Sequence, residues 1–155
     1  MPTEPETTDL YFVYGSLLPG LHNHMVLQES ELVLDGTIVG LLLSLGQFPA
    51  LVTNDILAER TTETVVGKVY RVADPTVARD LDYLEGYIPG RSNNLYEKQI
   101  VPVTCADGTI QYANVYSASM SLLRSLSGKE SLVPNGDWAP YYAKLQEWLE
   151  SHPLY

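Results

Sequence analysis

Hydrophobic and polar positions follow one another along the chain in short blocks that predict several strands and a few helices. The apolar run from Leu10 to Tyr14 predicts a buried strand. Residues 62–72 are rich in β-branched side chains and predict another strand. Between them, residues 36–52 predict one or two strands that are broken by Gly46 and Pro49.

An antiparallel hairpin is predicted in the second half of the chain. The strand-like segments 96–103 and 110–117 flank Ala106-Asp107-Gly108. An Asp-Gly pair tolerates the positive φ that a tight turn requires. Residues 21–36, in contrast, predict a short helix or a loop that leads into strand-like residues 32–34.

The spacing of apolar residues predicts a helix over residues 75–85. Asp74 can cap it and Pro75 fits its first turn. Val77, Leu81 and Leu84 share one helical face, and Gly86 ends the helix.

A final helix is predicted after Asn135-Gly136-Asp137. Its expected inward-facing side chains are Tyr141, Leu145, Trp148 and Leu149. Together these elements predict an α+β fold in which mostly antiparallel strands form a compact barrel or curved sheet with two to three helices. We expect residues 1–9 to be a flexible tail and residues 10–155 to be a single domain, because no repeat or linker interrupts the chain.

Composition and charge exclude several classes of partner. The formal net charge of −10 would be repelled by a phosphate backbone, so neither nucleic acid nor an anionic membrane is expected to bind. Cys105 is the only cysteine, so no intrachain disulfide can form. The first residues lack the pattern of a secretory signal, and the apolar stretch 37–45 is too short to span a bilayer. We therefore expect a cytoplasmic protein.

Glu85 is an unusual residue for its position. It lies at the edge of an apolar stripe and in the last turn of its helix, where the helix dipole disfavours negative charge. Both effects would raise its pKa, and such a carboxyl can act as a general base and acid near neutral pH. Alternatively, Glu85 reaches solvent or pairs with Arg91 or Lys98.

Other candidate groups carry weaker signals. Ser16 is not in a G-x-S-x-G motif, and the chain has no P-loop or dinucleotide fingerprint. His22 and His24 lack nearby ligand partners, so they favour a surface loop over a metal site. Cys105 is interpreted as an incidental thiol. Tyr96 is more notable, since it follows the loop 88–95 and enters its strand close behind Glu85.

Five segments, in this order, resemble the gamma-glutamylcyclotransferase-like family: YFVYGSLLPG, GQFPALV, VVGKVYRV, LDYLEGY and LYEKQIVPV. The resemblance covers residues 10–117, and VPNGDW extends it to residue 138. It implies a compact mixed barrel and a pocket in which the loop from Tyr14 to Leu17, with Gly15 and Ser16 between them, holds a γ-glutamyl α-carboxylate.

The resemblance also assigns roles to single residues. It implies that Glu85 is the catalytic acid and base and that Tyr96 is a pocket tyrosine. Trp138 departs from the pattern, because some members have a pocket tyrosine there.

The implied reaction is an intramolecular acyl transfer. The α-amine of a small γ-glutamyl substrate attacks its own γ-carbonyl, closes 5-oxoproline and expels an amine or amino acid, so neither a metal nor a cofactor is expected. Two alternatives stay open: a related enzyme that acts on a different γ-glutamyl compound, and a non-catalytic module that binds γ-glutamyl or amino-acid ligands. The oligomeric state is not predicted.

Overall fold

A closed barrel of five strands forms the body of the molecule in a computed structural model that describes residues 4–21, 23–126 and 130–152. The strand order is β1-β5-β2-β6-β7. The strands are β1 (Leu10–Val13), β2 (Glu31–Val39), β5 (Thr64–Arg71), β6 (Tyr96–Cys105) and β7 (Ile110–Ala118). All neighbours pair antiparallel except β1 and β7, which close the barrel in parallel.

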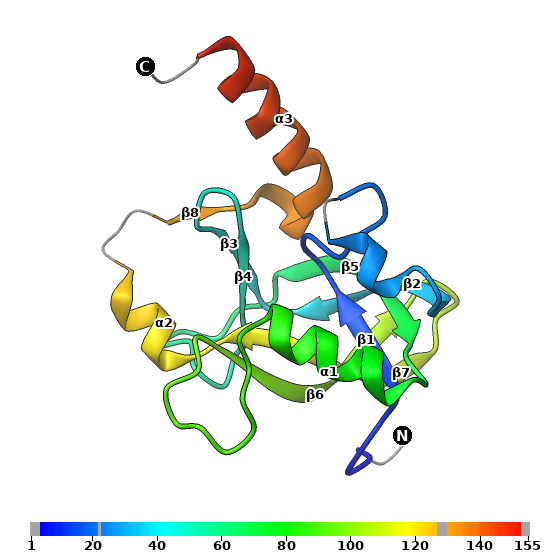
Figure 1. The fold of residues 1–155 in the computed structure, drawn as a ribbon. Coiled ribbons are helices and arrows are strands. Elements are labelled where there is room, and N and C mark those ends of the chain that lie inside the picture. The colour runs from blue at the N-terminus through cyan, green and yellow to red at the C-terminus, as the bar shows by residue number, and fades with distance from the viewer. Residues whose placement is uncertain (1–3, 22, 127–129, 153–155) are drawn as a thin grey trace.

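A second, three-stranded antiparallel sheet lies beside the barrel, in the order β4-β3-β8 (Figure 1). Its strands are β3 (Leu41–Ser44), β4 (Pro49–Val52) and β8 (Ser131–Leu132). The helices are α1 (Pro75–Leu84), α2 (Met120–Ser125) and α3 (Trp138–Ser151), with short 3-10 helices η1 (His24–Leu27) and η2 (Pro134–Gly136). The predicted α+β class with a mixed, mostly antiparallel barrel is confirmed.

Local sequence signals set the ends of the best-predicted elements. The Asp74 carboxylate accepts a hydrogen bond from the Thr76 N–H at 2.8 Å, which caps α1. Gly86 then takes a φ of +66° and ends the helix one residue earlier than expected, with Glu85 as its C-cap. In the β6–β7 hairpin, Gly108 takes a φ of +86° as the turn requires.

Two details of the prediction hold only in part. The chain does break at Gly46, between β3 and β4, but Pro49 does not break a strand, because it begins β4. The expected inward stripe of α3 holds at Tyr141, which packs against the core, but not at Trp148, which is 51% exposed and stacks on His152. The last turns of α3 extend away from the barrel, as Figure 1 shows.

The barrel interior is the main hydrophobic core. Trp138, at the start of α3, is 1% exposed and packs there with Phe12 and the barrel valines. The segment before β1 also contacts the barrel, since the Asn114 side chain donates to the Thr8 carbonyl and the Val72 N–H donates to the Asp9 carbonyl, each at 2.8 Å.

Candidate active site

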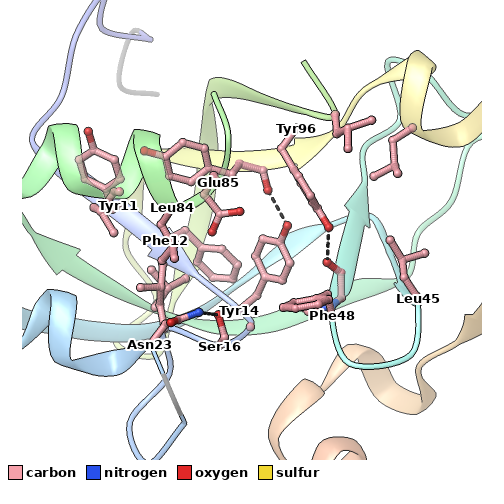
Figure 2. Close-up of a pocket in the computed structure, with 18 residues that line it drawn as sticks. Tyr11, Phe12, Tyr14, Ser16, Asn23, Leu45, Phe48, Leu84, Glu85 and Tyr96 are labelled. Carbon is pink, nitrogen blue, oxygen red and sulfur yellow. Dashed lines mark hydrogen bonds between the residues drawn. The ribbon is translucent and has the colours of Figure 1, made fainter. Parts of the chain in front are cut away.

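A cavity of about 320 Å³ lies where the end of β1 meets the end of α1 (Figure 2). Its volume is at the lower end of the range for small-molecule sites. Every site residue predicted from the sequence lines it: Tyr14, Gly15, Ser16, Leu17, Glu85 and Tyr96. The remaining wall is mostly apolar, with Leu45, Phe48 and Pro49 from the β3–β4 region and Leu84 and Leu95 on the α1 and β6 side.

The loop after β1 is held in place by hydrogen bonds to Asn23 and His24, which follow it in the chain. The Asn23 side chain donates to the Ser16 hydroxyl at 2.8 Å, and the Asn23 N–H donates to the Ser16 carbonyl at 3.0 Å. The His24 ring nitrogen lies 2.8 Å from the Leu17 carbonyl. Within the described residues, the N–H groups of residues 15–17 have no backbone or side-chain acceptor. Successive N–H groups of this kind can hold an anion.

Close packing against Pro49, as well as the proposed binding of an anion, explains why position 15 is a glycine. A Cβ atom at this position would lie 2.7 Å from the Cγ atom of Pro49, closer than real contacts allow. The loop can therefore approach β4 only with glycine here. A larger residue would displace the loop, so loss of binding in a Gly15→Val variant would not by itself identify an anion site.

Glu85 directs its carboxylate into the cavity from the end of α1, as Figure 2 shows. Its backbone N–H donates to the Leu81 carbonyl at 3.0 Å, which continues the helix through the C-cap. Burial raises the pKa of the Glu85 carboxyl from its ordinary value of 4.5 to about 7. A group with that pKa exchanges a proton readily at neutral pH.

The predicted alternative of an ion pair at Glu85 is wrong. Lys98 instead pairs with Asp82, with 3.1 Å between the Nζ and Oδ1 atoms. The Arg91 guanidinium donates to the Gly86 carbonyl and to the Asn94 side chain, each at 2.8 Å. Glu85 is thus the only charged side chain among the described residues that line the cavity.

Two tyrosine hydroxyls face the same space as Glu85, as Figure 2 shows. Tyr14 donates to the Tyr116 carbonyl at 2.5 Å, and Tyr96 donates to the Pro49 carbonyl at 2.9 Å. Burial, and then the neighbouring Glu85 carboxylate, raise the pKa of Tyr96 above its ordinary range. Because each hydroxyl has given its one proton to a backbone carbonyl, its oxygen faces the cavity as an acceptor.

The sequence interpretation missed several cavity residues. Asn23 stands between the two histidines that were considered and set aside, and Phe48 lies in the GQFPALV segment. Tyr11 and Tyr116 also line the wall, without any local signal that would have identified them. Trp138 is in the core and is not among the described cavity residues.

The remaining candidate groups lie elsewhere. Cys105 is 4% exposed in the barrel core, and His22 lies outside the described residues. The described His, Cys, Asp and Glu side chains form no group of three that could hold a metal ion. None of the described helices has the length and hydropathy that crossing a bilayer requires.

Comparisons with known proteins bear on this geometry. The sequence pattern of the family described as "Gamma-glutamyl cyclotransferase, AIG2-like" matches residues 11–140. The chain is 35% identical over 91 residues to a candidate gamma-glutamylcyclotransferase of Halalkalibacterium halodurans, a match that covers 59% of this chain and 69% of that one. It is 34% identical over 101 residues to the gamma-L-glutamyl-butirosin B gamma-glutamyl cyclotransferase of Niallia circulans, covering 63% of this chain and 60% of that enzyme.

A solved structure extends the comparison to the fold. YkqA from Bacillus subtilis superposes with a TM-score of 0.64 at 25% identity, over 91% of this chain and 43% of YkqA. The chain therefore spans less than two thirds of the Niallia circulans enzyme and less than half of YkqA.

Proposed function

The chain belongs to the gamma-glutamyl cyclotransferase, AIG2-like family, and we propose that it releases 5-oxoproline from a small γ-glutamyl compound. One observation carries the proposal above all others. The Glu85 carboxyl faces the cavity without a cationic partner among the described residues, and its pKa is raised to about 7. A module that only binds ligands would gain little from a proton-exchanging group there, so an enzyme is favoured over the binding module.

In the proposed reaction the substrate supplies both nucleophile and electrophile. Glu85 takes a proton from the α-ammonium, and the freed amine attacks the γ-carbonyl carbon to form the C–N bond of the five-membered lactam. Glu85 then gives this proton to the leaving nitrogen as the old C–N bond breaks. It next takes the remaining extra proton from the lactam nitrogen and passes it to the released amine, which leaves as an ammonium. Folding the substrate into the reactive conformer lowers the barrier by several kcal/mol, which is why neither a metal nor a cofactor is needed.

The neighbouring groups would hold the substrate in that conformer. The N–H groups of residues 15–17 and the Ser16 hydroxyl would hold the α-carboxylate, at a loop that Asn23 keeps in place. The Tyr96 oxygen would accept from the α-ammonium beside Glu85. Tyr14 would complete this wall.

The residues that line the outer part of the cavity favour one kind of leaving group over another. Leu45, Phe48, Leu84 and Leu95 line it, and none of the described cavity residues is Lys, Arg or His. A second carboxylate on the leaving group would find no counter-charge there. We therefore favour a γ-glutamyl amine over a γ-glutamyl dipeptide or glutathione. The name of the Niallia circulans relative gives gamma-L-glutamyl-butirosin B as the compound on which that enzyme acts.

The test measures 5-oxoproline release from a matched set of substrates. L-γ-glutamyl-isoamylamide and L-γ-glutamyl-leucine differ only in the leaving group's carboxylate, and glutathione extends the set. We expect the amide to have the highest kcat/KM, and Glu85→Gln to abolish release from all three. The exposed Glu59→Gln variant is the matched control and should retain full activity.

The possible results separate the claims. If no γ-glutamyl compound yields 5-oxoproline, the proposed activity is wrong. Normal release by Glu85→Gln would contradict the mechanism but not the activity. A higher kcat/KM for the leucine compound would contradict only the leaving-group preference.

A further inference from the structure

A pair of opposite charges lies directly behind the cavity wall. Asp82 on α1 and Lys98 on β6 are 3.1 Å apart, and each side chain keeps only 20% of its surface exposed. This pair has no place in the proposed reaction. It is also much less exposed than the other close ion pair of the barrel, in which the Asp35 side chain is 61% exposed.

The two elements that carry the pair also carry the reacting groups. On α1, Asp82 precedes Glu85 by three residues, so both side chains lie on adjoining parts of one helix face. On β6, Tyr96 and Lys98 are two residues apart and point to the same side of the strand. Tyr96 and Glu85 both line the cavity. Lys98, two residues after Tyr96, pairs with Asp82, three residues before Glu85.

The Lys98 ammonium is held in place by further groups. It lies 5.0 Å from the centre of the Tyr11 ring and 5.8 Å from the centre of the Tyr116 ring, and both rings line the cavity. The Tyr116 hydroxyl donates to the same Asp82 oxygen at 2.5 Å. The partly buried ammonium therefore lies against two aromatic rings of the cavity wall and is paired with Asp82.

The charged and titratable groups around Glu85 are few. Asp82 shares its helix, Tyr11 and Tyr14 come from β1 and its end, Tyr96 and Lys98 from β6, Tyr116 from β7, and Arg91 from the loop after α1. Arg91 is bound to the Gly86 carbonyl and to Asn94. Lys98 is bound to Asp82, on the helix that carries Glu85, so both of these nearby cations are held by other groups.

We propose that Asp82 is a positioning residue that holds the Lys98 ammonium on its own side of α1 and so leaves the Glu85 carboxylate without a cationic partner. The functional meaning of this arrangement rests on the proposed role of Glu85. A lysine ammonium that moved next to Glu85 would favour its ionised form, and the carboxyl would then stay deprotonated at neutral pH. It could no longer return a proton to a leaving nitrogen.

The test is a charge cycle with a direct measurement of protonation. The carboxyl carbon of Glu85 is titrated by carbon-13 NMR in the wild type, Asp82→Asn, Lys98→Met and the double variant. The wild type should titrate at a pH of about 7. Asp82→Asn should lower the midpoint by roughly one pH unit, because it frees an ammonium and removes a like charge.

In the other two variants we expect the titration midpoint of Glu85 to shift in the opposite direction and to return to its original value, respectively. Lys98→Met should raise the midpoint by roughly half a unit to one unit, since the Asp82 charge is then uncompensated. The double variant removes both charges, so its midpoint should return close to that of the wild type. It leaves no unpaired buried charge, so it is the variant best able to fold. Asp35→Asn with Lys68→Met, which removes an ion pair outside the described cavity residues, is the matched control and should not move the midpoint.

A merely structural role for Asp82 predicts a different pattern. If the pair only anchors α1 to the barrel, the variants lose stability or kcat while the midpoint stays in place or moves in the same direction in both single variants. Either pattern would overturn the inference. If Asp82→Asn does not fold, the rise in Lys98→Met and its reversal in the double variant still decide the question.

This inference and the proposed function can fail separately. The titration needs no substrate, so it gives its answer even if no γ-glutamyl compound is turned over. Where 5-oxoproline is released, the acidic limb of the kcat/KM profile should move by the same amount and in the same direction as the NMR midpoint. A limb that stays fixed while the midpoint moves would contradict the role of Glu85 as the titrating group, and leave the Asp82 inference standing.

Discussion

Glu85 reduces the stability of the fold at the pH at which it would act. Its pKa is about 7 in the folded protein against an ordinary value of 4.5, so between these values the folded state binds more protons than the unfolded state. The stabilising contribution of the neutral carboxyl is therefore fully present below about pH 4.5 and is lost as the pH rises through 7. The full shift corresponds to about 3 kcal/mol at 1.36 kcal/mol per unit.

We therefore expect Glu85→Gln to stabilise the protein at alkaline pH. Because part of the Glu85 surface is in contact with water, we discount the full value and expect a gain of about 1 to 3 kcal/mol at pH 8 relative to pH 4.5. Urea unfolding of both proteins at the two pH values measures it. The exposed Glu59→Gln variant should show no such pH dependence. A gain of equal size at both pH values would mean that the carboxylate is not destabilised by burial.

The sequence predicted part of the site at the level of single residues. Glu85 could be identified because a carboxylate at the edge of an apolar helix face is unusual in any fold. Its suggested partners could not be judged, because the competition of Asp82 for Lys98 depends on how α1 packs against β6. Asn23 and Phe48 approach the cavity only through tertiary contacts, so no local pattern marks them.

At the scale of elements, predictions were correct where the signal was local. The α1 cap, the helix end at Gly86 and the Asp-Gly turn each depend only on residues close by in the sequence. By contrast, β8 has two residues and exists because it pairs with β3. The six-residue α2 was likewise not predicted. The predicted stripe of α3 is inward at Tyr141, but the outer turns of the helix extend past the barrel that would have buried Trp148.

The turn before α3 provides a prediction at this scale. Gly136 has a φ of +60°, and a Cβ atom there would lie 2.0 Å from the Thr64 carbonyl oxygen of β5. Gly108 also has a positive φ, of +86°, but a Cβ atom would meet nothing within 4 Å. Gly108→Ala should cost about 1 to 2 kcal/mol from backbone strain alone. Gly136→Ala should cost more, roughly 3 kcal/mol or above, because β5 must also move.

Urea unfolding of the two alanine variants checks this difference, and the hairpin variant is the control for strain. Equal costs would mean that η2 does not approach β5 as closely as the structure has it. A large loss in Gly136→Ala would also show that this close approach, together with the packing of Trp138 in the core, fixes the start of α3 to the barrel.

At the scale of the whole molecule, the cavity is lined by both sheets, which also share the hydrophobic core that contains Leu42 and Leu51. The loop after β1 and the residues Tyr96 and Tyr116 come from the barrel, whereas Phe48 and Pro49 come from the turn and strand of the smaller sheet. The Tyr96 hydroxyl already links them by its bond to the Pro49 carbonyl. A ligand in the cavity would contact both sheets at once, so it should oppose any motion that separates them.

Hydrogen exchange can detect this coupling in the Glu85→Gln variant, in which we expect no turnover. Saturation with L-γ-glutamyl ethylamide should slow amide exchange in the loop 14–18 and, at the same time, in the β3–β4 turn, where the Leu45 N–H donates to the Phe48 carbonyl at 2.8 Å. If opening of the turn abolishes binding, a ligand at one hundred times its Kd slows exchange there by up to about 100-fold. The β6–β7 turn at residues 106–109 contributes no cavity residue and should be unchanged. Protection of the barrel loop alone would show that the ligand does not reach the smaller sheet.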